Sequence, residues 1–262
     1  MKKFDSILKK IFSFFTTFIS FLKKITSVAV IRKFDKFLEK IYSTTLIVSC
    51  FVIFIIGLII YGKSQLGWVL PLAILGPILI LFIAYLAKDF HEANKDLIKS
   101  NTTTIGNAAI LNFGAVISLF LSAIFFIFAF IGISEGSLTA VITSLLASLF
   151  LFISAGTQFN PTLLNVVVDK KSSAGEDFIS IFSLSLKSML YFEKIISTIL
   201  LVLGNIILVI NLINPSLAYF FSGLGFLSAG IAYPVLIYIF FTIFWFFNSI
   251  FLAILSLAKK NK

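Results

Sequence analysis

AAILNFGAVISLFLSAIFFIFAFIGI, residues 108–133, is an unbroken run without a charged residue. A helix needs about 20 predominantly apolar residues to cross the hydrocarbon core of a bilayer, so this run predicts a transmembrane helix. Similar runs lie at residues 46–61, 69–87, 138–155, 195–213 and 216–258. The sequence therefore predicts an all-α fold, a polytopic transmembrane helical bundle of about six spans.

The composition of the whole chain supports a membrane protein. Of its 262 residues, 60% are hydrophobic and 12% are charged, and the mean hydropathy is +1.11. A soluble domain is about half apolar and a quarter charged, so this composition excludes a soluble enzyme and a disordered tail. A single cysteine, Cys50, excludes an internal disulfide and a cysteine metal cluster.

The basic residues indicate how the chain is oriented. The net charge is +10, and residues 1–45 alone carry ten Lys and Arg against three acidic residues. With six spans, 20 of the 21 Lys and Arg fall on the side of the N-terminus. Cytoplasmic loops are enriched in Lys and Arg, so both termini are predicted to be cytoplasmic, in a bacterial cytoplasmic membrane or an organelle inner membrane. The expected partner of these charges is a bilayer with anionic headgroups, and no nucleic acid.

Residues 1–45 are predicted to form a basic amphipathic cytoplasmic arm. Apolar side chains recur in it with spacings of four and three, at Phe4, Leu8, Ile11, Phe15, Phe18, Leu22 and Ile25. The basic side chains expected at the membrane surface are Lys2, Lys3, Lys9, Lys10, Lys23, Lys24, Arg32 and Lys33. A helix of this kind lies in the membrane interface. A partner-binding helix and a cleaved signal peptide are the alternatives.

Residues 46–258 form the predicted transmembrane domain, and residues 259–262 a basic tail. Two interpretations of residues 217–232 remain open before Pro234: a re-entrant segment, or an extra span. The longest cytoplasmic loop, 156–194, contains the capping-box sequence Ser173-Ala-Gly-Glu176, followed by an apolar helical face. This pattern predicts an elbow helix along the cytoplasmic surface, or a coupling helix that docks on a soluble ATPase.

Groups for catalysis are scarce in the predicted spans. None of them carries Asp, Glu, Lys, Arg or His in its interior, which weighs against proton-coupled transport and intramembrane catalysis. The single histidine, His91, lies near Asp89, Glu92 and Asp96 in the loop 88–107. A metal or proton site is one interpretation, and a solvated, ion-paired connecting helix is the preferred one. We therefore expect no catalytic residues, no bound metal and no cofactor.

Small residues recur every fourth position in two adjacent spans. The first row is Gly114, Ser118 and Ser122, and the second is Ala140, Ser144 and Ser148. Such rows let helix backbones approach closely. A short turn joins the two spans, so we expect the rows to face each other or a partner helix.

Two functional hypotheses follow. The first is a non-catalytic subunit or scaffold of a larger membrane complex with other membrane chains, based on the missing chemistry, the small-residue rows and the long basic arm. The second is a transport component, a permease or lipid or small-solute transporter subunit without intramembrane charges. It rests on the elbow helix, on a proline-containing second span and on the glycine-rich segment 217–232.

Overall fold

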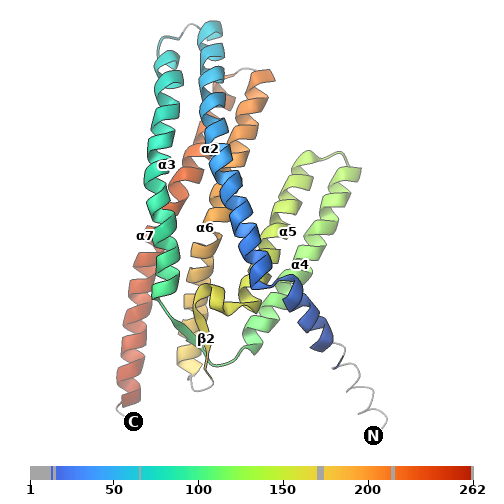
Figure 1. Cartoon of the computed structure of the whole chain (residues 1–262), viewed down its shortest axis with the longest axis vertical. Coiled ribbons are helices and arrows are strands. Elements are labelled where there is room, and N and C mark those ends of the chain that lie inside the picture. Colours follow the sequence, from blue (N-terminus) through green and yellow to red (C-terminus); the bar gives the residue numbers. More distant parts are fainter. Residues whose placement is uncertain (1–12, 14–15, 65, 170–173, 214–215, 261–262) are drawn as a thin grey trace. The chain divides into compact units, whose positions relative to one another are not determined.

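The computed structural model describes residues 13, 16–64, 66–169, 174–213 and 216–260. It is 90% helical, and six of its helices are long and apolar enough to cross a membrane, which confirms the predicted fold class. After a helical segment at residues 16–25, the elements in chain order are α2 (Val28–Ser64), α3 (Val69–Ser100), β1 (Thr103–Ile105), α4 (Ala109–Ser134), α5 (Leu138–Phe159), the 3-10 helix η1 (Pro161–Leu164), β2 (Val166–Val168), α6 (Ala174–Ile213) and α7 (Leu217–Lys260) (Figure 1).

The chain divides into two compact units. Unit 1 comprises Met1–Phe34 and Thr103–Ser180, and unit 2 comprises Asp35–Thr102 and Ile181–Lys262. The predicted boundary between the arm and the transmembrane domain, at residue 45, lies within α2, which passes through it without a break. The helical period of the arm continues directly into the first apolar run, so no turn separates them.

Unit 1 is built around the antiparallel hairpin of α4 and α5 (Figure 1). Gly136 makes the turn with a φ of +68°, in the left-handed region that suits glycine. Near the turn, a Cβ on Gly132 would lie 3.0 Å from the Val141 backbone nitrogen. The hydroxyl oxygen of Ser137 accepts a bond from the Ala140 amide at the start of α5. Close approach, a tight turn and a cap therefore fix this hairpin.

Two further contacts complete unit 1. The amide of Asn160, just after α5, donates to the carbonyl of Thr26 at 2.6 Å and joins the N-terminal segment to the hairpin. β1 and β2 form a parallel pair in the register Thr103 to Val166. This pair could not be predicted from the sequence, because strands of three residues are too short for a periodicity to be visible.

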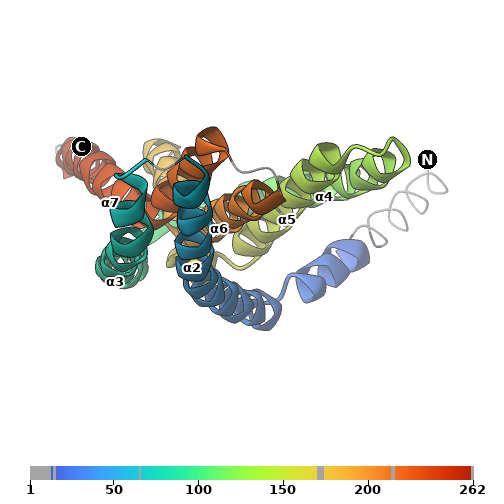
Figure 2. The same cartoon turned by 90° about the horizontal axis from the view of Figure 1, so that it is seen from above.

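Unit 2 packs four long helices: α2 from Asp35, α3, α6 from Ile181, and α7 (Figure 2). Its main apolar core lies where the apolar runs meet, and consists of Leu46, Ile53, Ile56, Ile60, Val69, Ile80, Ala84, Ala87, Leu201, Leu208, Phe220, Leu227 and Ile231. α6 and α7 approach each other closely at Gly204 and Gly223. A Cβ on Gly223 would lie 2.6 Å from Leu208 Cγ and 3.1 Å from the carbonyl oxygen of Gly204.

α7 continues as one helix through Pro234. Residues 217–232 are therefore neither a re-entrant segment nor a separate span, but the first part of a helix of 44 residues. α6 is likewise continuous over 40 residues, so the segment predicted as an elbow is its first half and no turn separates it from the fifth apolar run. The capping residue Ser173 lies outside the described residues.

Candidate functional site

A buried carboxylate lies at the centre of unit 2, where the apolar run of α6 begins. Glu193 is only 3% exposed, and its two carboxylate oxygens lie 2.9 and 3.0 Å from Nδ1 of His91 on α3. The hydroxyl of Ser197, one turn along α6, donates to the same carboxylate at 3.2 Å. A buried charge requires such partners, because an unpaired ion in an apolar interior is strongly disfavoured.

Aromatic and amide groups enclose this pair from α2 and α3. The ring of Tyr42 on α2 meets the His91 ring edge to face, with centroids 5.1 Å apart. Within the described part of the chain, the Tyr42 hydroxyl and His91 Nε2 are buried without a hydrogen-bond partner. One turn after His91, the amide of Asn94 donates to the carbonyl of Pro234 on α7 at 3.1 Å. The cluster therefore draws side chains from α2, α3 and α6 and a backbone carbonyl from α7.

Two further contacts join α2 to α6 beside the cluster. The hydroxyl of Tyr191 donates to Asp35 at 2.9 Å. Lys194 donates to Glu39 at 3.1 Å. The Glu39 carboxylate is 67% exposed, so this second pair is screened by solvent and contributes at most about 1 kcal/mol.

Lys187, six residues before Glu193 on α6, is fully buried. Its ammonium group donates to the carbonyl of Asn101, the residue that ends α3, and lies 5.7 Å from the ring centre of Trp245 on α7. A cation at a helix C-terminus is stabilised by the carbonyls that the helix leaves unpaired. One α6 turn away, the amide of Asn248 donates to Ser183 at 2.5 Å. These contacts fasten α3, α6 and α7 together.

No protein-family model, curated protein or solved structure matches this chain. The cluster itself limits the chemistry. The described residues contain no group of three His, Cys, Asp or Glu side chains that could hold a metal ion. His91 and Glu193 can share a proton, while the hydroxyl of Ser197 is engaged as a donor to the carboxylate. The His91–Glu193 and Asn94–Pro234 contacts link helices, and the Ser197 bond supports Glu193 within α6.

The structure changes the interpretation of residues 88–107. Residues 88–100 are the second half of α3, and the acids Asp89, Glu92 and Asp96 are exposed, as expected for a solvated helix. His91 instead faces inward and pairs with Glu193, 102 residues later. A sequence pattern cannot show this pairing, because the two residues are distant in the chain and Glu193 lies just before an apolar run. The inward helical face that His91 shares with Asn94 was the available signal.

The small-residue rows lie along the α4–α5 hairpin. The hydroxyls of Ser122 and Ser148 each donate to the other's backbone carbonyl, at 2.8 and 2.9 Å. Ser118 accepts a bond from the Gln158 amide at 3.4 Å, and a Cβ on Gly114 would collide with the same side chain. Ala140 lies against Gly132, and Ser144 is half-buried. Both rows are thus used largely within the hairpin.

The predicted membrane-surface residues fall into two sets. Lys23, Lys24, Arg32 and Lys33 are exposed. The ammonium of Lys23 lies 5.7 Å from the ring centre of Phe159 on α5. Lys2, Lys3, Lys9 and Lys10 lie outside the described residues.

Proposed function

We propose that this chain is a non-catalytic subunit of a larger membrane complex, and the length of α7 carries the proposal. A helix of 44 residues is about 66 Å long at 1.5 Å per residue, whereas the hydrocarbon core of a bilayer is about 30 Å thick. An upright α7 therefore carries about 36 Å more helix than the core can cover. A tilt of the usual size, about 20°, removes only a small part of this excess.

The excess helix is apolar on its outer side. After Pro234, one set of large side chains is more than a third exposed, which we call the distal α7 face: Leu236, Ile239, Phe240, Ile243, Phe246 and Phe247. A contiguous apolar surface of this kind marks a lipid or protein contact. The charged side chains of the neighbouring helix, α3, distinguish lipid contact from protein contact.

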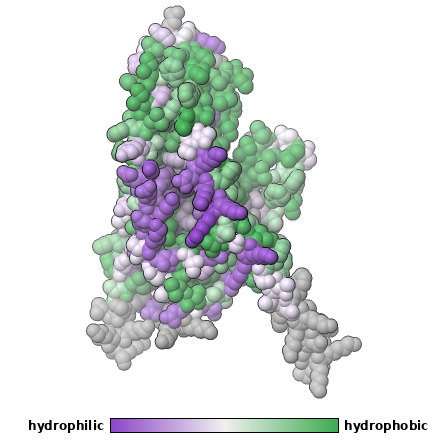
Figure 3. Space-filling view, viewed as in Figure 1, coloured by the Kyte–Doolittle hydropathy of each residue, from purple (hydrophilic) through white to green (hydrophobic). Residues whose placement is uncertain are grey.

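The C-terminal part of α3 lies beside the part of α7 that begins at Pro234. This part of α3 carries charged side chains. Asn94 contacts Pro234, and the Phe90 and Tyr238 rings lie 5.4 Å apart. The exposed side chains of this part of α3 include Lys88, Asp89, Glu92, Lys95, Asp96 and Lys99. Figure 3 shows a hydrophilic band below the hydrophobic surface formed by the upper parts of α2 and α3.

Covering the distal α7 face with lipid has a high free-energy cost. Placing it in the hydrocarbon core would bring the charged half of α3 to the same depth, at about 2.5–3.5 kcal/mol for each charge at the helix centre. Another protein chain can cover apolar side chains beside charged ones, since protein interfaces combine an apolar centre with a polar rim. These observations favour a partner chain over lipid.

The proposal includes that both termini lie on the cytoplasmic side and that the chain has no catalytic role. The basic residues on the N-terminal side of the spans support termini on the cytoplasmic side. A cysteine at Lys99 should then be shielded from an impermeant reagent added outside intact cells, while one at Gly67, in the turn before α3, should react. Reaction at both positions would contradict the orientation.

Site-specific photo-crosslinking tests the interface. A photoreactive residue replaces Phe247 on the distal α7 face, and the matched control replaces Leu75 in the apolar half of α3; both side chains are more than half exposed. In native membranes we expect position 247 to give a discrete adduct with another protein, and position 75 to give lipid adducts. Lipid adducts at both positions, or an adduct of the chain with itself at 247, would overturn the proposal.

Purification gives a second measurement. Phe247→Ser should lower the stoichiometry of the partner that crosslinks at 247, because it removes an apolar contact, while Leu75→Ser should leave it unchanged. Equal loss from the two variants would point to general destabilisation rather than to an interface.

A further inference from the structure

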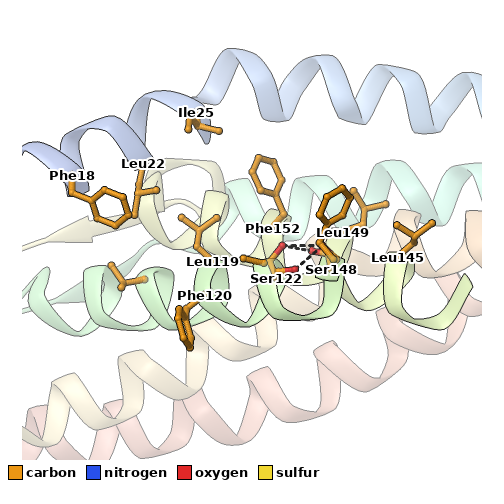
Figure 4. Close-up of a pocket in the computed structure, with 13 residues that line it drawn as sticks. Phe18, Leu22, Ile25, Leu119, Phe120, Ser122, Leu145, Ser148, Leu149 and Phe152 are labelled. Carbon is orange, nitrogen blue, oxygen red and sulfur yellow. Dashed lines mark hydrogen bonds between the residues drawn. The ribbon is translucent and has the colours of Figure 1, made fainter. Parts of the chain in front are cut away.

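Unit 1 contains an apolar pocket of about 740 Å³ between three helical segments (Figure 4). Phe18, Leu22 and Ile25 of the N-terminal helix form one wall, and α4 and α5 form the others. This volume lies within the range of small-molecule sites, about 300–1,000 Å³. The pocket is distinct from the distal α7 face, which belongs to unit 2.

The lining shows what chemistry the pocket accepts. Ser122 and Ser148 are the polar residues that line it, and each hydroxyl already donates to the other's carbonyl. All the other lining side chains are apolar, among them Phe120, Phe126 and Phe152. A ligand that fills this space gains apolar contact and meets hydroxyls that are already paired, so a hydrocarbon chain fits better than a polar solute.

The pocket's length corresponds to one leaflet. Along α4 its lining extends from Val116 to Phe126, about 15 Å at the helical rise. Half of a hydrocarbon core of about 30 Å is the same distance. The helix concerned is among the most apolar of the chain, so the pocket lies where lipid chains are the available ligand.

Positive charge lies at one end of the pocket. Leu22 and Val116 pack in the same cluster as Phe159, and the ammonium of Lys23 lies over the Phe159 ring. Lys24 is the next residue and is also exposed. The Lys23 ammonium therefore lies close to the end of the pocket defined by Val116, near the N-terminal end of α4, and Lys24 follows it on the same helix. A lipid phosphate is the group that matches them at a bilayer surface.

We propose that this pocket holds one acyl chain of an anionic phospholipid, with the phosphate of that lipid at Lys23 and Lys24. The chain runs along α4 toward Phe126, between the N-terminal helix and the hairpin. This site differs from general lipid contact because three helical segments surround the chain and two lysines select its headgroup. It would bind one lipid per protein.

Native mass spectrometry tests the site. The protein is reconstituted in a bilayer of equal parts phosphatidylcholine and phosphatidylglycerol, extracted in mild detergent and analysed for retained lipid. We expect one retained phosphatidylglycerol per protein. Retention of both lipids in equal amounts, or of none, would overturn the proposal.

Three variants separate the two parts of the site. Ala123→Trp and Leu145→Trp each fill the pocket from a different helix and should abolish retention. Leu145 is 42% exposed, so this position tolerates a larger side chain. Lys23→Gln combined with Lys24→Gln should keep the chain site but lower the preference for phosphatidylglycerol by about thirty-fold, from about 1 kcal/mol for each lysine.

A matched charge variant controls for net charge. Arg32→Gln combined with Lys33→Gln removes the same charge from exposed positions that do not line the pocket, and should retain the lipid as the original chain does. An equal loss of preference in this control would assign the effect to overall charge. Undiminished retention in both pocket-filling variants, with their helical content intact, would refute the acyl-chain site.

Discussion

Removing His91 should destabilise unit 2 more than removing the carboxylate to which it is paired. His91→Leu leaves the Glu193 carboxylate, 3% exposed, with the Ser197 hydroxyl as its remaining hydrogen-bond donor. Loss of one partner from a buried ion pair costs about 3–5 kcal/mol, because the other charge stays buried. We expect a loss in that range in the free energy of unfolding.

Glu193→Leu should cost less. It leaves an imidazole that can be neutral and a Ser197 hydroxyl that can bond to the carbonyl one turn earlier on its own helix. An unsatisfied neutral group costs about 1–3 kcal/mol. In the double variant both partners are apolar, and such replacements of buried pairs are often nearly neutral, so the double variant should be more stable than His91→Leu alone.

The assay is reversible unfolding in mixed detergent micelles, followed by circular dichroism. Glu92→Gln, at an exposed position one residue along α3, is the matched control and should change stability by less than about 0.5 kcal/mol. A double variant that loses as much as the two single variants added together would show that the residues are not coupled, and would refute the assignment of a buried pair.

Five other substitutions, at four positions, probe the remaining contacts. Gly223→Ala should cost about 1–3 kcal/mol because its Cβ would lie 2.6 Å from Leu208 Cγ, and it is measured by the same unfolding assay; an unchanged stability would contradict the close approach. Ser122→Ala and Ser148→Ala should each cost about 0.6–1.7 kcal/mol, and a loss of zero in both would show that their bonds contribute nothing. Lys187→Met should be less destabilising than Lys187→Ala by about 2 kcal/mol or more, since Met preserves the buried stem; equal losses would mean that the ammonium alone matters.

The transmembrane helices could be predicted because their signal is local. Each apolar run corresponds to part of a helix in the structure, and the short turn at Gly136 identified α4 and α5 as neighbours. The ends of the helices were harder to predict than their positions, because α2 and α6 extend well beyond their apolar runs into polar sequence. A change in polarity marks where a helix leaves an apolar environment, and it does not mark where the helix ends.

The buried cluster could not be predicted from a single sequence. Glu193 and Lys194 lie next to each other just before an apolar run, as charged residues at the end of a transmembrane helix often do. Nothing in the local sequence shows that Glu193 faces inward and Lys194 outward. Their 100° separation on the helix places Glu193 toward α3 and Lys194 toward Glu39. Such pairings depend on the packing of distant segments, which only the structure supplies.

The amount of apolar sequence also bears on the partner. Six spans of about 20 residues require about 120 residues. The chain has 262 residues, of which 60% are hydrophobic, so about 157 are apolar, and the spans themselves include serines, threonines and glycines. The surplus therefore lies outside the spans, and under the proposal made above the exposed apolar side chains of α7 after Pro234 belong to it. A chain that lies alone in a bilayer gains nothing from apolar side chains beyond the hydrocarbon core. A chain that binds a partner there gains stability from each one, so the surplus itself favours a complex.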